Sequence, residues 1–336
     1  MNKKRIISAS LIVISFLIPI LIKDFYILHI FIMTYIAITA AVGLGLLMSG
    51  GMISCTQAGI MAIGAYSSSL LVMKAGLSFW LALPLSGLIS TTLGLVACYP
   101  TLRLKGLYFI MVTFAVSEMI RLVIVNWPSF LGGYSGIPMV PKPNPIAIPG
   151  LTTIEFTSKI PYYYLILVIM LIALLTIYRL YVSRMGRVLR SLHESDVLAE
   201  SIGISVMRYK AIAFGIVCFF AGLAGSFLAH YNRLVAPEFF TIWVSIYYLI
   251  YAQVGGHATV LGPLLGASFF SILPEFLRGM QQYSPIIFSV LLVLAIFFLP
   301  GGLETLPRRL KTYWHTRILG RAPHERAKED RMHGLS

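Results

Sequence analysis

Charged residues are scarce in this 336-residue chain: Asp, Glu, Lys and Arg together make up 11% of it, and only 12 residues are acidic. A soluble domain carries roughly a quarter charged residues, so the composition excludes a protein that faces water on all sides. Hydrophobic residues account for 58% of the chain, and its mean hydropathy is +0.86. We therefore expect an integral membrane protein.

Residues typical of metal, redox or nucleotide chemistry are also few. Cys55, Cys98 and Cys218 lie far apart in apolar surroundings, which indicates buried fillers rather than a disulfide framework or a CxxC pair. The seven histidines form no HExxH-like cluster, and no GxxxxGK[ST] stretch is present to cradle phosphates. We expect no catalytic residues, no metal and no bound cofactor, with any ATP handled by another subunit.

Apolar blocks close to the length that a helix needs to cross the hydrocarbon core follow one another along the chain. The first block has the charged start of a secretory signal, but no cleavage site of small residues follows, so we interpret it as a retained span. The predicted fold class is an all-α integral membrane protein with about ten transmembrane helices, some of them broken. The predicted spans are Ile6–Ile22, Ile27–Met48, Ala58–Met73, Leu77–Tyr99, Leu107–Val125, Tyr162–Tyr181, Ala211–His230, Phe240–Val254, Val260–Leu277 and Pro285–Leu299.

The net charge of +14 is explained by topology rather than by nucleic-acid binding. With ten spans, the basic clusters all fall on one side of the membrane, and short cytoplasmic loops are enriched in Lys and Arg. This places the N- and C-termini in the cytoplasm. The clusters are Lys3/Lys4/Arg5, Arg103/Lys105, Arg179/Arg184/Arg187/Arg190, Arg208/Lys210 and the tail from Arg308 onward.

Two segments are too polar or too rich in proline to span. Residues 126–161 contain seven prolines, so they cannot form one helix and are predicted to be an external loop. Residues 183–208 are predicted to lie in the cytoplasm, with Met185, Val188, Leu189 and Leu192 repeating at helical spacing. The residues alone leave two interpretations of that helix open: it lies on the inner leaflet, or it docks a cytoplasmic protein.

Glycine-rich segments predict helix interruptions. GGMISCTQAGIMAIGAY starts at Gly50 and GGHATVLGPLLGA starts at Gly255. Broken helices within a membrane are tolerated where they are buried in protein or line a cavity, and their backbone is able to bind solutes. Close helix packing through small residues explains the same pattern equally well, as it does for AGLAG at Ala221–Gly225.

Charged residues at membrane depth are functional candidates, and few qualify here. Glu118 and Arg121 are spaced for mutual pairing on one helix, while Glu238, Glu275 and Arg278 fall near predicted span ends. A structural pair or an interfacial position is the favoured interpretation for all of them. The scarcity of intramembrane carboxylates argues against self-powered, proton-coupled transport.

Most of the chain resembles the permease subunits of bacterial branched-chain amino acid ABC importers of the LivM type. The resemblance rests on motifs that occur in the family's order, although Cys55-Thr56 stands where the family more often has Leu-Gly and His193 where it often has Arg. The motifs are GGMISCTQAGIMAIGAY, RLKGLYFIMVTFAVSEMIR, LGGYSGI, SRMGRVLRSLHESDVLAESIGISVMRYKAIAF and GGHATVLGPLLGA.

The resemblance implies a subunit that catalyses nothing and forms a path for branched-chain or related amino acids by alternating access. It places coupling to the ATP-binding subunit on Arg187, Glu194, Asp196, Glu200 and Gly203. The candidate path residues are Thr56, Gln57, Tyr66, Gly255 and Gly256.

The implied partners are a second, related permease subunit forming a heterodimer, two cytoplasmic ATP-binding subunits that hold ATP and Mg²⁺, and an external solute-binding protein. Lipid surrounds the chain in the bacterial inner membrane, and no nucleic acid is involved. Residues 1–306 form the transmembrane permease domain and 307–336 a basic cytoplasmic tail. Two alternative functions stay open: an ion-coupled secondary transporter, and an ABC permease for urea, short amides or sugars.

Overall fold

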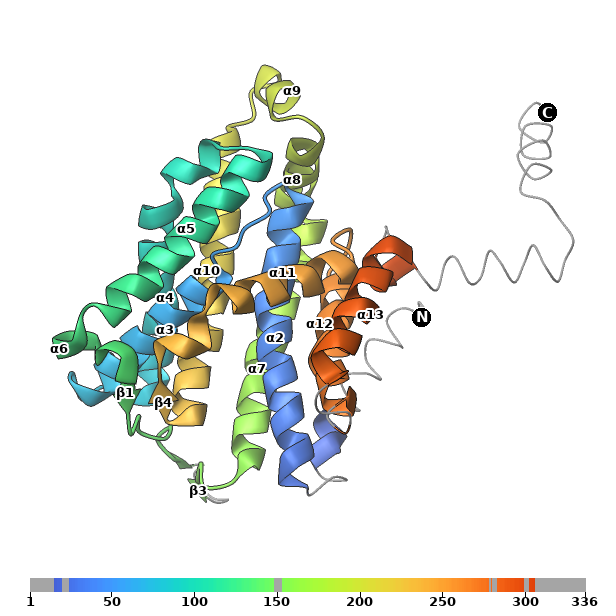
Figure 1. Ribbon diagram of the computed structural model, residues 1–336. Helices are drawn as coiled ribbons and strands as arrows, with labels where there is room; N and C mark the ends of the chain where they lie inside the picture. Colours follow the sequence, from blue (N-terminus) through green and yellow to red (C-terminus); the bar gives the residue numbers. More distant parts are fainter. Residues whose placement is uncertain are drawn as a thin grey trace, which may run out of the picture.

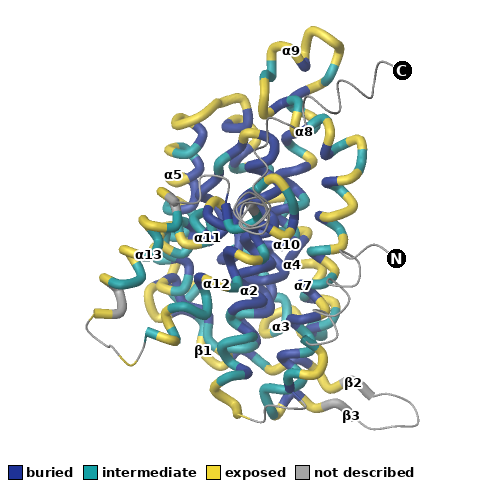
Figure 2. The backbone as a smooth tube through the Cα atoms, turned by 90° about the vertical axis from the view of Figure 1, so that its right-hand side faces the viewer, coloured by how far each residue is buried: buried dark blue, intermediate teal, exposed yellow. Residues whose placement is uncertain are grey.

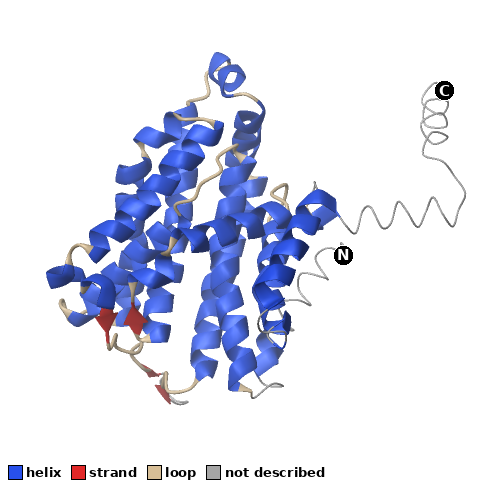
Figure 3. Cartoon of the chain, viewed as in Figure 1, coloured by secondary structure: helices blue, strands red, loops and turns tan. Residues whose placement is uncertain are grey.

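The computed structural model describes residues 15–19, 24–147, 153–277, 279, 283–298 and 302–305. Helices make up most of this part of the chain, and its short strands gather near one end (Figure 3). The α-helices are α2 (Phe25–Ser49), α3 (Gln57–Met73), α4 (Phe79–Cys98), α5 (Gly106–Val125), α6 (Pro128–Leu131), α7 (Lys159–Val182), α8 (Arg184–Glu194), α9 (Asp196–Ser201), α10 (Val206–Asn232), α11 (Ile242–Gly255), α12 (Leu261–Phe276) and α13 (Ser284–Phe298).

Short 3-10 helices and strands join these elements. β1 (Ile137–Pro138) pairs antiparallel with β4 (Leu234–Val235), with Ile137 opposite Val235, and β2 (Ile146–Ala147) pairs antiparallel with β3 (Thr153–Ile154). The 3-10 helices are η1 (Pro100–Arg103), η2 (Gly133–Ser135), η3 (Pro237–Phe240) and η5 (Leu303–Thr305).

Five helices among the described residues are long and apolar enough to cross a membrane: α2, α4, α5, α7 and α10. Three shorter apolar helical stretches lie at 57–73, 261–276 and 286–295. Each predicted span from Ile27 onward coincides with a described helix, because a continuous apolar run hydrogen-bonds its own backbone most completely as a helix. The first predicted span lies mostly outside the described residues, and the count of ten stays a prediction.

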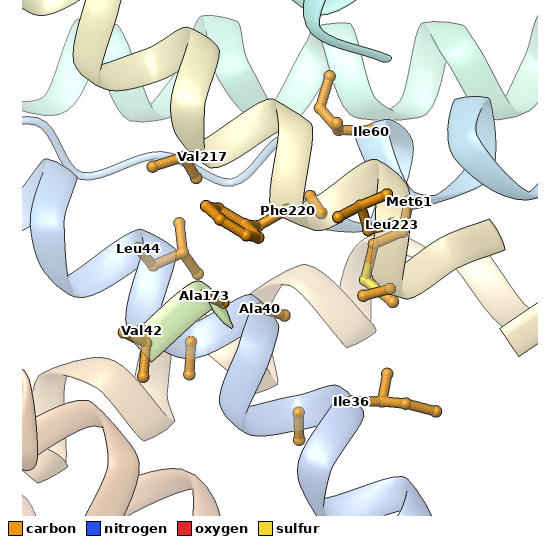
Figure 4. Close-up of a cluster of buried hydrophobic side chains, with 14 of the residues drawn as sticks. Ile36, Ala40, Val42, Leu44, Ile60, Met61, Ala173, Val217, Phe220 and Leu223 are labelled. Carbon is orange, nitrogen blue, oxygen red and sulfur yellow. The ribbon is translucent and has the colours of Figure 1, made fainter. Parts of the chain in front are cut away.

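The core lies where α2, α3, α7 and α10 meet. Figure 2 shows the buried backbone concentrated along the centre of the molecule, with exposed positions on the outer helices. In Figure 4, Leu44 of α2, Ile60 of α3, Ala173 of α7 and Phe220 of α10 lie in one cluster of buried apolar side chains. The central helices are thus fixed to one another by protein packing rather than by contact with lipid.

Small residues allow α3 and α10 to approach closely. A Cβ atom on Gly64 would collide with the backbone of Gly222, and one on Gly225 would collide with the backbone of Met61. Such contacts are how membrane helices pack without a hydrophobic driving force between them. The packing role predicted for the AGLAG segment is confirmed.

The molecule has two distinct ends, with α9 at one and the β strands at the other (Figure 1). We refer to these as the α9 end and the strand end. The described part of the proline-rich segment 126–161 folds at the strand end into α6, η2 and short strands, and it is irregular as predicted up to Lys159, where α7 begins. The predicted tail 307–336 lies outside the described residues.

Candidate functional site

The chain between α2 and α3 returns into the helix bundle without forming a helix. Gly51 adopts a φ of +74°, which glycine reaches without strain, and the chain then has no regular secondary structure up to Thr56, the residue before α3. Residues 52 and 54–56 are buried. In Figure 1 this connection descends from the top of α2, so that α3 begins inside the bundle.

Three hydroxyl groups accept hydrogen bonds from the backbone at the start of α3. The amides of Cys55, Ala58 and Gly59 donate to Thr113 Oγ1 (3.1 Å), Ser245 Oγ (2.8 Å) and Ser117 Oγ (3.1 Å). The first amides of a helix have no partner within it, and water is scarce at this depth. These side chains of α5 and α11 therefore make a helix start inside the bundle possible.

The candidate path residues of this region all have partners within the chain. The Thr56 hydroxyl shares a hydrogen bond with Ser54 (2.8 Å), Gln57 Nε2 donates to the Ala40 carbonyl (3.0 Å), and the Tyr66 hydroxyl donates to the Val235 carbonyl (3.4 Å). All three candidates are buried. Their contact with a solute stays a prediction, and these surroundings give each of them a structural role.

Gly255 ends α11, and Gly256 begins the short connection to α12. Gly256 has a φ of +100°, and a Cβ atom on Gly255 would collide with the backbone of Gly262. Gly302 also approaches these two glycines closely. The helix interruption expected here is present, together with the close packing that was the competing interpretation.

The segment 183–208 forms two consecutive helices, α8 and α9. The Ser183 hydroxyl caps α8 by accepting from the Met185 amide, and the Ser195 hydroxyl caps α9 by accepting from the Leu198 amide. Leu189 and Leu192 of α8 are buried, whereas its Arg187, Arg190, His193 and Glu194 are exposed. The predicted amphipathic helix is present.

Asp196 is held by two lysines that come from distant parts of the chain. Its Oδ2 accepts from Lys210 Nζ at 2.9 Å and lies 3.1 Å from Lys105 Nζ. Burial raises the pKa of the Asp196 carboxyl, but the hydrogen bonds from Lys210 and Lys105 outweigh burial and hold that pKa below its ordinary value. Asp196 therefore fixes α9 to the starts of α5 and α10.

The other predicted coupling residues are accessible. Arg187, Glu194, Glu200 and Gly203 are all exposed at the α9 end, with Asp196 the exception among the five. Sequence reasoning missed the apolar side chains among them. Val197 and Leu198 of α9 and Ile202 at its C-cap are 70%, 67% and 72% exposed, where α9 projects beyond the bundle. We call these three residues the α9 tip. The signal for the α9 tip in the sequence was the apolar pair Val197-Leu198 and the nearby Ile202 within a polar stretch.

The outward face of α5 carries an ion pair. Arg121 Nε donates to both carboxylate oxygens of Glu118, at 2.9 and 3.0 Å, and Arg121 Nη2 also donates to Glu118. The mutual pairing predicted from their spacing is confirmed. The pair borders an open groove of about 500 Å³, which we call the α5 groove. Its lining residues are Phe114, Ala115, Glu118, Met119, Leu122, Val123 and Asn126.

Among the described residues, no group of three or more His, Cys, Asp or Glu side chains is placed to hold a metal ion. Several membrane-length helices, together with buried non-helical backbone inside the bundle, define a multi-pass membrane protein of the transporter class. Residues 26–300 match the family described as branched-chain amino acid transport system / permease component, and the chain belongs to this family. It is thus a permease subunit.

Curated relatives support this membership. The chain is 32% identical over 294 residues to the high-affinity branched-chain amino acid transport system permease protein LivM of Salmonella typhimurium, which covers 82% of this chain and 69% of the relative. The Escherichia coli protein of the same name is 30% identical over 82% of this chain and 69% of the relative. A probable LivM of Methanocaldococcus jannaschii is 23% identical over 66% of this chain and 67% of its own. No solved structure matches the chain.

Proposed function

We propose that this chain is the membrane-spanning subunit of an ABC importer for branched-chain or related amino acids in the bacterial inner membrane. The observation that carries the proposal is the family match over residues 26–300, which includes all of α3 to α13 and all of α2 but its first residue. Like other permeases, the subunit moves a solute without chemical change, and ATP hydrolysis takes place on separate subunits.

The α9 end faces the cytoplasm in this proposal. Arg103 and Lys105 precede α5, Arg184 begins α8, and Arg208 lies in the first turn of α10, so basic residues gather at this end. The enrichment of Lys and Arg in short cytoplasmic loops supports that orientation. Both termini then lie in the cytoplasm, and the strand end faces the solute-binding protein outside.

The α9 tip is the proposed contact with one of two ATP-binding subunits. Three exposed apolar side chains beyond the membrane are costly in water and are typical of an interface. Glu194 and Glu200 are exposed beside them, which is the pattern of an apolar centre with a polar rim. Closure of the ATP-binding subunits around ATP and Mg²⁺ would move α9, and Asp196 would transmit that movement to α5 and α10.

A second, related permease subunit completes the path, and lipid covers the remaining apolar surface. The two subunits alternate between an outward-open and an inward-open state, so the solute-binding protein delivers its cargo to the strand end and release follows at the α9 end. A heterodimer is proposed because the family pairs two related permeases.

The test is reconstitution of the chain in vesicles with the permease, ATP-binding and solute-binding subunits encoded near it. ATP-dependent uptake of labelled leucine is measured with unlabelled valine, urea and ribose as competitors. We expect valine to compete and the other two to have no effect. Competition by urea or by the sugar would assign the path to the alternative ABC cargo.

Glu194→Arg tests the coupling surface, with Glu155→Arg as the matched control. Both glutamates are exposed, but Glu155 directly follows β3, which lies at the strand end. Glu194→Arg is expected to abolish co-purification of the ATP-binding subunits, which Glu155→Arg retains. Leucine uptake by this chain alone, driven by an ion gradient and indifferent to ATP, would overturn the ABC assignment in favour of a secondary carrier.

A further inference from the structure

The Glu118–Arg121 pair lies on a face of α5 that the described part of the chain leaves open. The side chains are 29% and 22% exposed, and they border the α5 groove. Counted along the helix at about 1.5 Å per residue, they lie roughly 18 and 22 Å from its start at Gly106. This is the strand-end half of a helix of 20 residues, within the depth that the membrane spans.

Contact with lipid tails is energetically unfavourable for this ion pair. Charged side chains within membranes almost always face a bundle interior or a water-filled cavity, because contact with lipid tails is costly. The helix α4 of the same molecule has the face that lipid favours: its exposed side chains include Leu81, Leu88 and Val96, and its sequence contains no charged residue. The contrast indicates that the α5 groove faces the path between the two permease subunits rather than lipid.

The pair matches the charges of one kind of solute. A free α-amino acid is a zwitterion whose carboxylate and ammonium lie close together. An arginine guanidinium recognises a carboxylate through two parallel hydrogen bonds, and a glutamate accepts from an ammonium group. The apolar side chains of Phe114, Met119 and Leu122 beside the pair suit an aliphatic side chain.

We propose that Arg121 and Glu118 bind the carboxylate and the ammonium of a zwitterionic amino acid as it passes along the α5 groove. The internal ion pair opens, and each member exchanges its partner for one end of the solute. The site and the solute remain neutral together throughout, so no net charge enters the membrane. Urea and sugars lack the two charges and are not held, which deepens the cargo assignment on which this inference rests.

Uptake by charge variants tests the pair. Arg121→Gln and Glu118→Gln are each expected to lower ATP-dependent leucine uptake by about tenfold or more, the factor that loss of a hydrogen bond to a charged group produces. Co-purification of the ATP-binding subunits checks that each variant still assembles. The swapped double variant, E118R with R121E, keeps an ion pair on the same face. If it restores wild-type uptake, the pair is structural and the proposal is overturned.

Cysteine accessibility gives a readout that does not depend on folding of those variants. Leu122→Cys lies in the α5 groove at a position 45% exposed, and Leu88→Cys is its control on the lipid-type face of α4, 55% exposed. The three native cysteines are buried. A charged, membrane-impermeant thiol reagent added outside is expected to modify Leu122→Cys alone, with slower modification in the presence of leucine-loaded binding protein.

Equal resistance of both cysteines to the reagent would show that lipid or tight protein packing covers the groove, which would overturn the inference. Leucine uptake by the wild-type complex distinguishes failure of this inference from failure of the proposed function. If it imports leucine while the variants behave as wild type, only this inference fails; if it imports no amino acid, the proposed function fails and takes the inference with it.

Discussion

Asp196 joins three parts of the chain that are far apart in sequence. Its carboxylate lies at the start of α9, Lys105 precedes α5, and Lys210 lies in the first turns of α10. The Lys210 side chain is only 7% exposed, whereas that of Lys105 is 62% exposed. The two lysines are therefore unequal partners, because a buried cation depends on its counter-charge far more than a hydrated one.

Asp196→Asn is expected to destabilise the folded protein by about 3 kcal/mol or more, since it leaves the Lys210 ammonium buried without a carboxylate. Thermal unfolding in detergent measures the loss. Lys105→Met serves as the control and should cost less than about 1 kcal/mol, as exposed ion pairs do. Equal losses for the two variants would contradict the assignment of Lys210 as the main partner.

The same carboxylate predicts a dependence on pH. Because the folded pKa of Asp196 is lowered below its ordinary value of 3.8, its stabilising contribution is complete above that value and is lost as the pH falls through the lowered folded pKa. The difference in melting temperature between the wild type and Asp196→Asn should therefore stay constant from neutral pH down to 3.8 and shrink only below that value. Thermal unfolding of both proteins in detergent across this range measures the difference, and a difference that already shrinks near neutral pH would contradict the prediction.

At the scale of elements, α3 begins where a helix start is difficult to satisfy. Its first amides point to hydroxyl groups on α5 and α11 rather than to water. A helix terminus inside a membrane protein carries a partial positive charge and unpaired N–H groups. The three hydroxyls stabilise that terminus and fix the relative positions of α3, α5 and α11. A movement of α5 during transport would therefore displace the start of α3.

Ser245→Ala is expected to destabilise the protein by about 1–3 kcal/mol, because the Ala58 amide would lose its acceptor in a buried position. Ser90→Ala is a matched control. Ser90 is equally buried, and its hydroxyl has no hydrogen-bond partner in the structure, so its removal should be neutral or stabilising. Thermal unfolding of both variants checks the difference, and equal effects would refute the role of Ser245 as a cap.

At the scale of the whole molecule, the fold depends on how closely its central helices approach. Contacts of α10 with α3, α4 and α2, and of α2 with α7 and α12, form the centre of the bundle. Membrane helices gain stability from van der Waals packing rather than from exclusion of water. The glycines at the crossing of α3 and α10 are therefore determinants of the tertiary structure.

Gly64→Leu is expected to prevent correct packing, because the new side chain would meet the backbone of Gly222, which cannot move without separating two helices. Gly279→Leu is the control, since no described residue lies within 4 Å of a Cβ atom at that position. The fraction of monodisperse protein after extraction in detergent measures the effect. Wild-type behaviour of Gly64→Leu would show that the helices are further apart than described.

Much of the architecture was predictable from local sequence. The apolar blocks gave the helices from α2 to α13 because hydrogen bonding within a membrane leaves few alternatives to a helix, and the 3.6-residue period gave the amphipathic α8. The spacing of Glu118 and Arg121 gave their ion pair, since side chains three apart on a helix are neighbours. The family motifs then gave the class of transporter.

What the sequence alone determined, then, are properties set by neighbours along the chain: which segments are helical, which are polar, and which charges pair within one turn. Only the tertiary structure decided that Gln57 and Tyr66 are buried with internal partners and that Asp196 pairs with Lys105 and Lys210. It also decided that the α9 tip is exposed and that the Glu118–Arg121 pair borders an open groove. Burial and distant pairing depend on how helices cross in space, and helical spacing along one segment carries no information about the segment that packs against it.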